Sequence, residues 1–264
     1  MEESSLKKSF SAKMKDFFSN IHDVYAFIVR FFKEIILPPY EFKEILRQCY
    51  YIGYKSLALV SLTGFITGIV FTKQSRPSLA DFGATSWLPS LIGIAIIRAL
   101  APLITALIAA GKIGSNIGAE LGSMNVTEQI DAMEVSGTKP FKFLAGSRIV
   151  ATTIMVPVLT LFNGFVGIVG SYLNVHSNEM TSFRSFIQDA FSSISFLDIN
   201  ASMIKATVYG FTIGVTGCFM GYNTTQGTQG VGKAANSSVV ISMFLIFIEE
   251  MIIVQIVNTI RPPF

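Results

Sequence analysis

The sequence predicts an all-α membrane protein. Hydrophobic residues make up 51% of its 264 residues and charged residues only 14%, whereas a soluble domain is typically about 25% charged. Crossing about 30 Å of hydrocarbon takes roughly 20 helical residues, and five apolar windows are long enough. Their apolar runs are continuous rather than alternating, which favours helices over a barrel. The five windows are residues 50–71, 88–110, 149–173, 203–222 and 239–260.

The distribution of Lys and Arg predicts the orientation in the membrane. Of 20 such residues, 14 fall on one side: nine in residues 1–55, four in the 111–148 connection, and Lys233. Cytoplasmic loops of membrane proteins carry an excess of Lys and Arg. We therefore expect a cytoplasmic N-terminus and, after five spans, a C-terminus on the opposite side, where Arg261 also falls.

An amphipathic helix is expected before the first span. Residues 10–36 place apolar side chains such as Phe17, Val24 and Phe31 on one helical face, a pattern typical of a helix at the membrane interface. The alternative is a helix packed on the protein's own spans. Pro38 and Pro39 end the pattern, so we divide the chain into an N-terminal segment, 1–40, and a five-span domain, 41–264.

Small residues recur at helical spacing in several places. Ala110, Gly114, Gly118 and Gly122 follow the second window, Gly64 and Gly68 lie in the first, and Gly210, Gly214, Gly217 and Gly221 lie in the fourth. Such stripes let helix backbones approach closely, and we interpret them as packing surfaces.

The connection after the second window also predicts a short acidic helix. Asn125 and Glu128 have the spacing of a capping box, and Glu128, Asp131 and Glu134 recur every three residues. Gly137 and Pro140 end the segment. A short acidic helix is suited to docking a soluble partner with a basic groove, although an ordinary polar loop is an open alternative.

Three separated motifs resemble those of the MlaE family of ABC permeases. The first is GKIGSNIGAELGSMNVTEQIDAMEVSGTKP, residues 111–140, where the family has a glycine-rich helix, AELG and TEQIDA. The second is RALAP, residues 98–102, where the family usually has Arg-Glu-x-Gly-Pro. The third is GYNTTQGTQGVGKAANSSVV, residues 221–240. The resemblance covers roughly residues 45–260.

This resemblance implies the permease subunit of an ABC transporter that moves phospholipids or related lipids between the inner and outer membranes of a bacterium. It implies an inner-membrane homodimer with a periplasmic C-terminus, a separate ATPase subunit that binds the ATP and magnesium, and an MCE-domain lipid-binding partner in the periplasm. It places the lipid route near the first, second and fifth spans at the dimer interface. The implied helix that couples to the ATPase comprises Asn125, Val126, Thr127, Glu128, Gln129, Ile130, Asp131, Ala132, Met133 and Glu134.

Four charged residues within the windows are candidates for the lipid pathway. A charge near the bilayer centre costs at least about 2.5–3.5 kcal/mol and usually faces protein or water. Arg98, Glu249 and Glu250 fall near mid-membrane. Ala99 stands where the family commonly has Glu, so we hypothesise that Arg98 pairs with Glu249 or Glu250 instead. The equally open alternative is that these residues pair with other groups or are protonated. Lys205 is expected near the outer end of its span, where it snorkels to lipid phosphate or anchors the helix.

Other functional classes have little support. Gly227–Lys233 fits GxxxxGK, but Ala234 replaces the Ser or Thr that would hold magnesium, so we expect no nucleotide site in this chain. The two histidines are isolated and the two cysteines form no spacing motif, so the sequence suggests no metal site. The apolar windows contain no recognisable set of catalytic residues. We therefore expect no enzyme activity, no cofactor in this chain and no nucleic-acid partner. An ion-coupled secondary transporter or channel is the main alternative.

Overall fold

Five helical stretches of the protein are long and apolar enough to cross a membrane, which confirms the predicted number. In the computed structural model, residues 2–38, 40–225 and 227–260 are described, with side chains from residue 19 onward. All the elements in this described part are helices. The membrane-spanning stretches are α2 (Phe42–Asp81), Thr85–Val126, Phe141–Glu179, α9 (Phe196–Tyr222) and α10 (Gly227–Ile260).

Two of these stretches change helix type along their length. The second consists of η1 (Thr85–Trp87), α3 (Leu88–Ala95), η2 (Ile96–Leu100), α4 (Ala101–Ala109), η3 (Ala110–Gly114) and α5 (Ser115–Val126), of which η2 and η3 are π-helical. The third consists of η4 (Phe141–Gly146) and α7 (Ser147–Glu179). The remaining helices are α1 (Glu2–Ile36), α6 (Gln129–Val135) and α8 (Phe183–Ser192).

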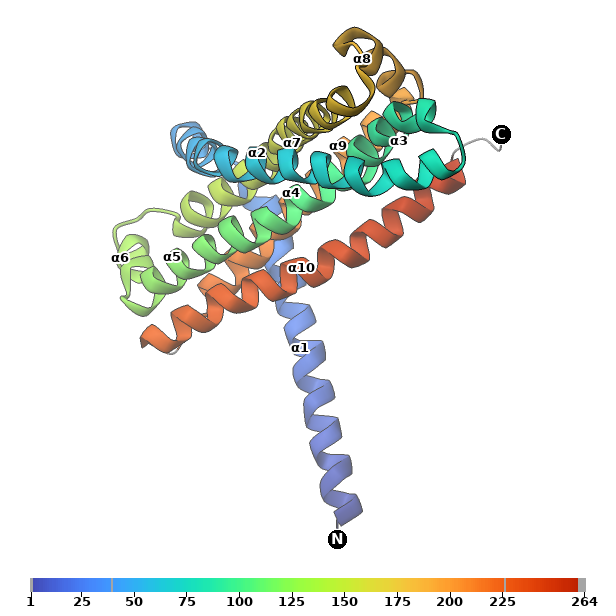
Figure 1. Cartoon of the computed structure of the whole chain (residues 1–264). Helices are drawn as coiled ribbons and strands as arrows, with labels where there is room; N and C mark the ends of the chain where they lie inside the picture. Colours follow the sequence, from blue (N-terminus) through green and yellow to red (C-terminus); the bar gives the residue numbers. More distant parts are fainter. Residues whose placement is uncertain (1, 39, 226, 261–264) are drawn as a thin grey trace.

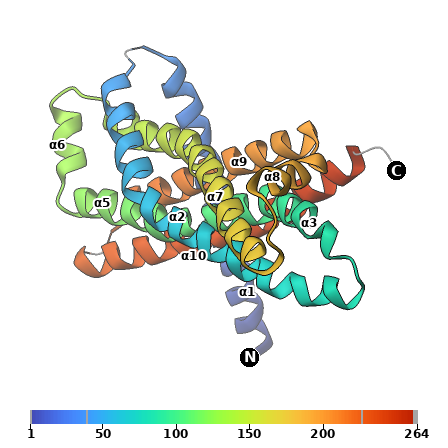
Figure 2. The same cartoon turned by 45° about the horizontal axis from the view of Figure 1, so that its top comes forward.

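The spans run back and forth between two ends of one bundle (Figures 1 and 2). Helix α6, the start of α2 and the start of α10 lie at one end, and α3, α8 and the end of α10 lie at the other. We call these the α6 end and the α8 end. Helix α8 lies in the connection between the third and fourth spans. Arg261, which was expected beyond the last span, lies outside the described residues.

The second span is longer than the window predicted for it. Its helix continues from residue 110 to Val126 through the glycine-rich segment, because that segment packs against other helices. A Cβ on Gly118 would contact the backbone of Ala234 in α10, and one on Gly122 would contact Thr224. Close packing here outweighs the low helix propensity of glycine. The predicted packing role of this stripe is therefore confirmed.

The second half of α1 packs on the bundle, while its first half points away from it (Figure 1). Phe31 is only 5% exposed, and the ring of Phe27 lies 4.9 Å from that of Phe141 in an edge-to-face arrangement. This half of the helix therefore matches the alternative of packing on the protein's own spans. Phe17 lies among the residues whose side chains are not described, and Pro39 lies outside the described residues. An interfacial position for α1 and the domain division at residue 40 stay predictions.

Helices α2 and α7 pack along much of their length through glycines. A Cβ on Gly68 would lie 2.0 Å from the carbonyl oxygen of Gly167, and one on Gly64 would lie 2.3 Å from Oδ1 of Asn163. Because these distances leave no room for a methyl group, the two backbones are in direct contact. The stripe predicted in the first window is thus also a packing surface.

The variant Gly68→Ala should separate α2 from α7 and lower the free energy of unfolding by about 1–3 kcal/mol, as overpacking usually does. Thermal unfolding of the purified protein in detergent measures this. Gly232→Ala is the matched control, since nothing lies within 4 Å of its added Cβ. Equal melting temperatures for the two variants would contradict the direct backbone contact.

Candidate functional site

A buried ion pair joins α9 to α10 inside the bundle. Nζ of Lys205 lies 2.7 Å from Oε1 of Glu250, and the two side chains are 2% and 17% exposed. The hydroxyl of Tyr209, which is fully buried, donates to Oε2 of the same carboxylate. Both oxygens of Glu250 are therefore occupied. The expectation that Lys205 extends to the membrane surface is wrong, because its ammonium group has a partner inside the protein.

Lys205 also reaches the second span at its π-helical segment. Pro102 has no N–H group, so the usual α-helical donor to the carbonyl of Arg98 is missing. In η2 the N–H of Ala101 instead donates to the carbonyl of Ile96, and Nζ of Lys205 donates to the carbonyl oxygen of Arg98 at 3.3 Å. A proline in the RALAP motif thus leaves a backbone acceptor open for the buried lysine.

Arg98 does not pair with Glu249 or Glu250 as hypothesised. Its Nε lies 3.8 Å from Oδ1 of Asp198, and its Nη2 donates to Oδ1 of Asn258 at 2.7 Å. Lys205 already holds Glu250, so this carboxylate is not available to Arg98. Asp198 supplies the carboxylate absent at Ala99, although sequence reasoning missed it.

Asp198 is itself fixed by the start of α9. Its Oδ2 accepts a hydrogen bond of 3.1 Å from the backbone N–H of Ser195, the N-cap residue of a capping box. The Ser-x-x-Asp pattern was the signal that could have located this residue, but the pattern alone does not point to Arg98.

Glu249 occupies a different position on α10. Thr212 donates to its Oε1, while its Oε2 is buried without a hydrogen-bond partner. The structure thus brings Arg98, Lys205 and Glu250 into one network with Asp198. Glu249 lies outside this network, because it contacts Thr212, about one turn along α9 from Tyr209.

An apolar cavity adjoins this network. Its volume is about 390 Å³, within the range of about 300–1,000 Å³ that is typical of ligand pockets. Ile97, the neighbour of Arg98, and Ile199, the neighbour of Asp198, both line it, as does Phe165 of α7. The arrangement combines paired charges with an apolar volume, which suits a molecule that has a charged group and a hydrocarbon part.

The predicted acidic helix forms α6, at the opposite end of the bundle. Ile130 is 5% exposed in the core and Met133 is half-buried against it. Glu128, Gln129, Asp131, Ala132 and Glu134 are exposed. One side of α6 is therefore fixed to the bundle. The other side presents the carboxylates of Asp131 and Glu134, and that of Glu128 is exposed just before the helix.

The predicted capping box at Asn125 and Glu128 is wrong. Asn125 and Val126 belong to α5, and Glu128 precedes α6 with a left-handed backbone (φ 58°) and no side-chain cap. Nδ2 of Asn125 instead donates to the carbonyl oxygens of Tyr222 and Thr224, at 3.0 and 2.8 Å. Those carbonyls at the end of α9 lack helical donors, so they compete successfully for the amide. Thr127 donates back to Ser123 at 2.8 Å and closes α5.

Comparison with known proteins identifies the family. The family model described as Permease MlaE matches residues 45–256, which is most of the chain. The chain belongs to the MlaE permease family. A "Probable ABC transporter permease protein" of Rickettsia prowazekii is 35% identical over 237 residues, 89% of this chain and 90% of the relative.

Two further relatives come from photosynthetic organisms. A "Probable ABC transporter permease protein" of Synechocystis is 34% identical over 79% of each chain. The chloroplast protein TRIGALACTOSYLDIACYLGLYCEROL 1 of Arabidopsis thaliana is 34% identical over 80% of this chain and 60% of the relative. This MlaE permease is therefore a multi-pass membrane protein, related to bacterial proteins named as probable ABC transporter permeases and to a chloroplast protein.

The variant Lys205→Met should be strongly destabilised, by about 3–5 kcal/mol, because it leaves Glu250 buried without its cation. Adding Glu250→Met removes the unpaired carboxylate and should restore part of that loss. Thermal unfolding of the single and double variants measures the coupling, with Arg184→Gln, an exposed position on α8, as the control. Strictly additive losses would show that the two side chains do not interact.

Proposed function

We propose that the protein is the permease subunit of an ABC transporter that moves phospholipids or related lipids between the inner and outer membranes. The observation that carries this proposal is the network of Arg98, Asp198, Lys205 and Glu250 beside an apolar cavity, within the spans of an MlaE-family chain. A lipid needs both parts: cations for its phosphate and an apolar volume for its acyl chains.

The charges of this network are suited to reversible lipid binding. Arg98 is 23% exposed, and its distance of 3.8 Å from Asp198 is long for a charge-assisted hydrogen bond. A lipid phosphate can therefore compete for its guanidinium group, while the fully paired Lys205 holds the helices together. The relative from Arabidopsis is named for a glycolipid, which is consistent with a lipid substrate.

The energy for transport comes, in this proposal, from a separate ATPase subunit docked on α6. Ile130 and Met133 hold α6 on the bundle, so a force on the exposed Asp131 and Glu134 is passed to α5 rather than lost in a loose loop. The segment from Asn125 to Glu134 is the proposed coupling region, although only Gln129–Val135 is helical as α6. ATP and magnesium would be bound by that subunit, and this chain would carry no catalytic residues.

A homodimer is proposed on the exposure of α10. Only 11% of its most apolar window is buried within the chain, and large apolar side chains recur on one face at helical spacing. Some of these contact lipid and the rest would contact a second copy. The exposed set is Val240, Phe244, Phe247, Met251, Ile252 and Ile256.

The proposed orientation puts the α6 end in the cytoplasm and the α8 end in the periplasm. It rests on the Lys and Arg distribution, and it gives the ATPase access to α6. A periplasmic MCE-domain protein would then receive or deliver lipid at the α8 end.

Affinity purification of the tagged protein from native membranes, followed by mass spectrometry, tests the proposal. We expect an ATPase, an MCE-domain protein and phospholipid to copurify. A homo-oligomer that retains neither ATPase nor lipid would contradict it and would favour an ion-coupled secondary transporter or channel.

Reversing the charge of α6 tests the docking surface separately. The double variant Asp131→Lys and Glu134→Lys should reduce the copurified ATPase at least about tenfold, since like-charge contact at an interface costs several kcal/mol. The matched control is Asp189→Lys on α8, at the opposite end of the bundle. Equal ATPase recovery from both proteins would exclude α6 as the docking site.

A further inference from the structure

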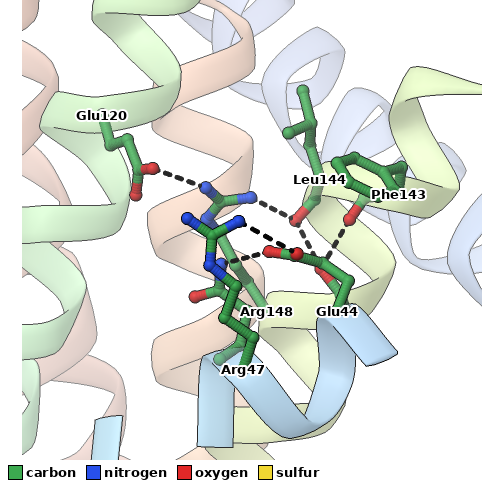
Figure 3. Close-up of polar contacts among 8 residues, drawn as sticks. Glu44, Arg47, Glu120, Phe143, Leu144 and Arg148 are labelled. Atoms are coloured by element: carbon green, nitrogen blue, oxygen red, sulfur yellow. Dashed lines mark hydrogen bonds and ion pairs between the residues drawn. The ribbon is translucent and has the colours of Figure 1, made fainter. Parts of the chain in front are cut away.

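A second cavity, lined by polar and charged side chains, lies at the α6 end, well separated along the spans from the Lys205 network. It measures about 480 Å³ and lies between α2, α5 and the start of α7. Helix α2 packs along α7, whereas α5 packs mainly on α9 and α10, so the cavity fills the angle between them. Figure 3 shows Glu44 and Arg47 approaching from α2, Glu120 from α5 and Arg148 from α7.

Two buried donors in the cavity wall have no partner. Oγ of Ser56 and Nε of Arg148 are buried without a hydrogen-bond partner, and both residues are 2% exposed. The other nitrogens of Arg148 are occupied, Nη2 by Glu120 at 2.8 Å and Nη1 by the carbonyl of Leu144 at 2.9 Å. Unpaired buried donors are costly and rare. Since a hydroxyl and a guanidinium N–H both donate, the missing partner is an acceptor.

The charges of the cavity specify an anion. Four cations line it against two carboxylates: Arg47, Lys55, Lys112 and Arg148 against Glu44 and Glu120. Both carboxylates already have partners, because Glu120 binds Arg148 and Glu44 accepts from Gln48 at 2.7 Å. The cavity thus keeps two positive charges in excess.

The surroundings indicate that the anion is a lipid headgroup. Tyr50, Tyr51 and Tyr54 on the same part of α2 are 58%, 42% and 67% exposed, and exposed tyrosines mark the membrane–water interface. Nζ of Lys55 lies 4.1 Å from the ring centre of Tyr51, so its charge is at the same level as these tyrosines. Apolar side chains complete the wall, among them Ile113 and Phe143, and they suit the first part of an acyl chain.

We propose that this cavity binds the phosphate group of an anionic phospholipid from the leaflet at the α6 end. The phosphate oxygens accept from Ser56 and Arg148 and neutralise the excess charge of Lys55 and Lys112. The lipid thereby joins α2 to α5, next to the segment that leads into α6. This site is distinct from the network of Lys205 and does not depend on transport.

Native mass spectrometry of the delipidated full chain, titrated with phosphatidylglycerol, tests the proposal. We expect one tightly bound lipid per chain. Its affinity should be at least about tenfold lower in Lys55→Gln/Lys112→Gln, which corresponds to a loss of about 1.4 kcal/mol of charge-assisted hydrogen bonding. Lys33→Gln/Lys43→Gln removes two exposed charges outside the cavity and should bind normally. Equal loss in both variants, or equal binding of uncharged diacylglycerol, would overturn the proposal.

Two further measurements define the ligand and its position. Displacement of the lipid by millimolar inorganic phosphate would show a small-anion site and overturn the lipid assignment, whereas retention of the lipid supports it. Loss of this lipid in Arg98→Gln, with retention in Lys55→Gln/Lys112→Gln, would place it at the other site and overturn the proposal.

Ser56→Ala separates ligand binding from folding. Without lipid, the variant should be at least as stable as the original protein, because it removes an unpaired buried hydroxyl. With phosphatidylglycerol, it should bind more weakly. Unchanged affinity would show that Ser56 does not contact the phosphate.

Discussion

Hydrocarbon offers no hydrogen-bond partners, so a polar group inside this bundle is costly unless another group of the protein pairs with it. Lys205 shows the consequence most clearly. Its buried ammonium group contacts the carboxylate of Glu250 and the carbonyl of Arg98, so α9, α10 and η2 meet at one point. Rotating any of the three helices would separate a donor from its acceptor. This one side chain therefore constrains how three of the five spans face one another.

Close backbone packing makes such contacts possible. A Cβ on Gly210 or Gly214 would collide with Thr152 or Ile149 of α7, and Gly221 lies against Leu121 of α5. Helix α9 is therefore enclosed on two sides, and 61% of its apolar window is buried, the largest share among the five spans of the described chain. Its polar residues have little access to lipid, which is why Lys205 and Tyr209 pair within the protein.

The spans and their packing faces could be predicted from the sequence, because segment length, hydropathy and glycine spacing are local properties. The partners of the buried polar side chains could not be predicted in this way. Arg98 and Glu250 fall at similar depths, but depth leaves the rotation of each helix open, and Asp198 and Asn258 occupy the positions around Arg98. The predicted cap at Asn125 was wrong for a related reason: its amide donates to carbonyl oxygens about a hundred residues away in the chain. Local patterns cannot predict partners that only tertiary packing brings together.

Helix α9 connects the two regions to which we assign function. Near its start, Asp198 and Lys205 hold Arg98 and Glu250, and at its end Tyr222 accepts a hydrogen bond from Asn125, three residues before Glu128 and α6. The glycines between these points are packed against α5 and α7, so α9 cannot bend freely there. In the proposed mechanism, a displacement of α6 is passed through the Asn125 bonds to the end of α9. Because Lys205 is bonded to both neighbouring spans, the network beside the apolar cavity would then move with α9.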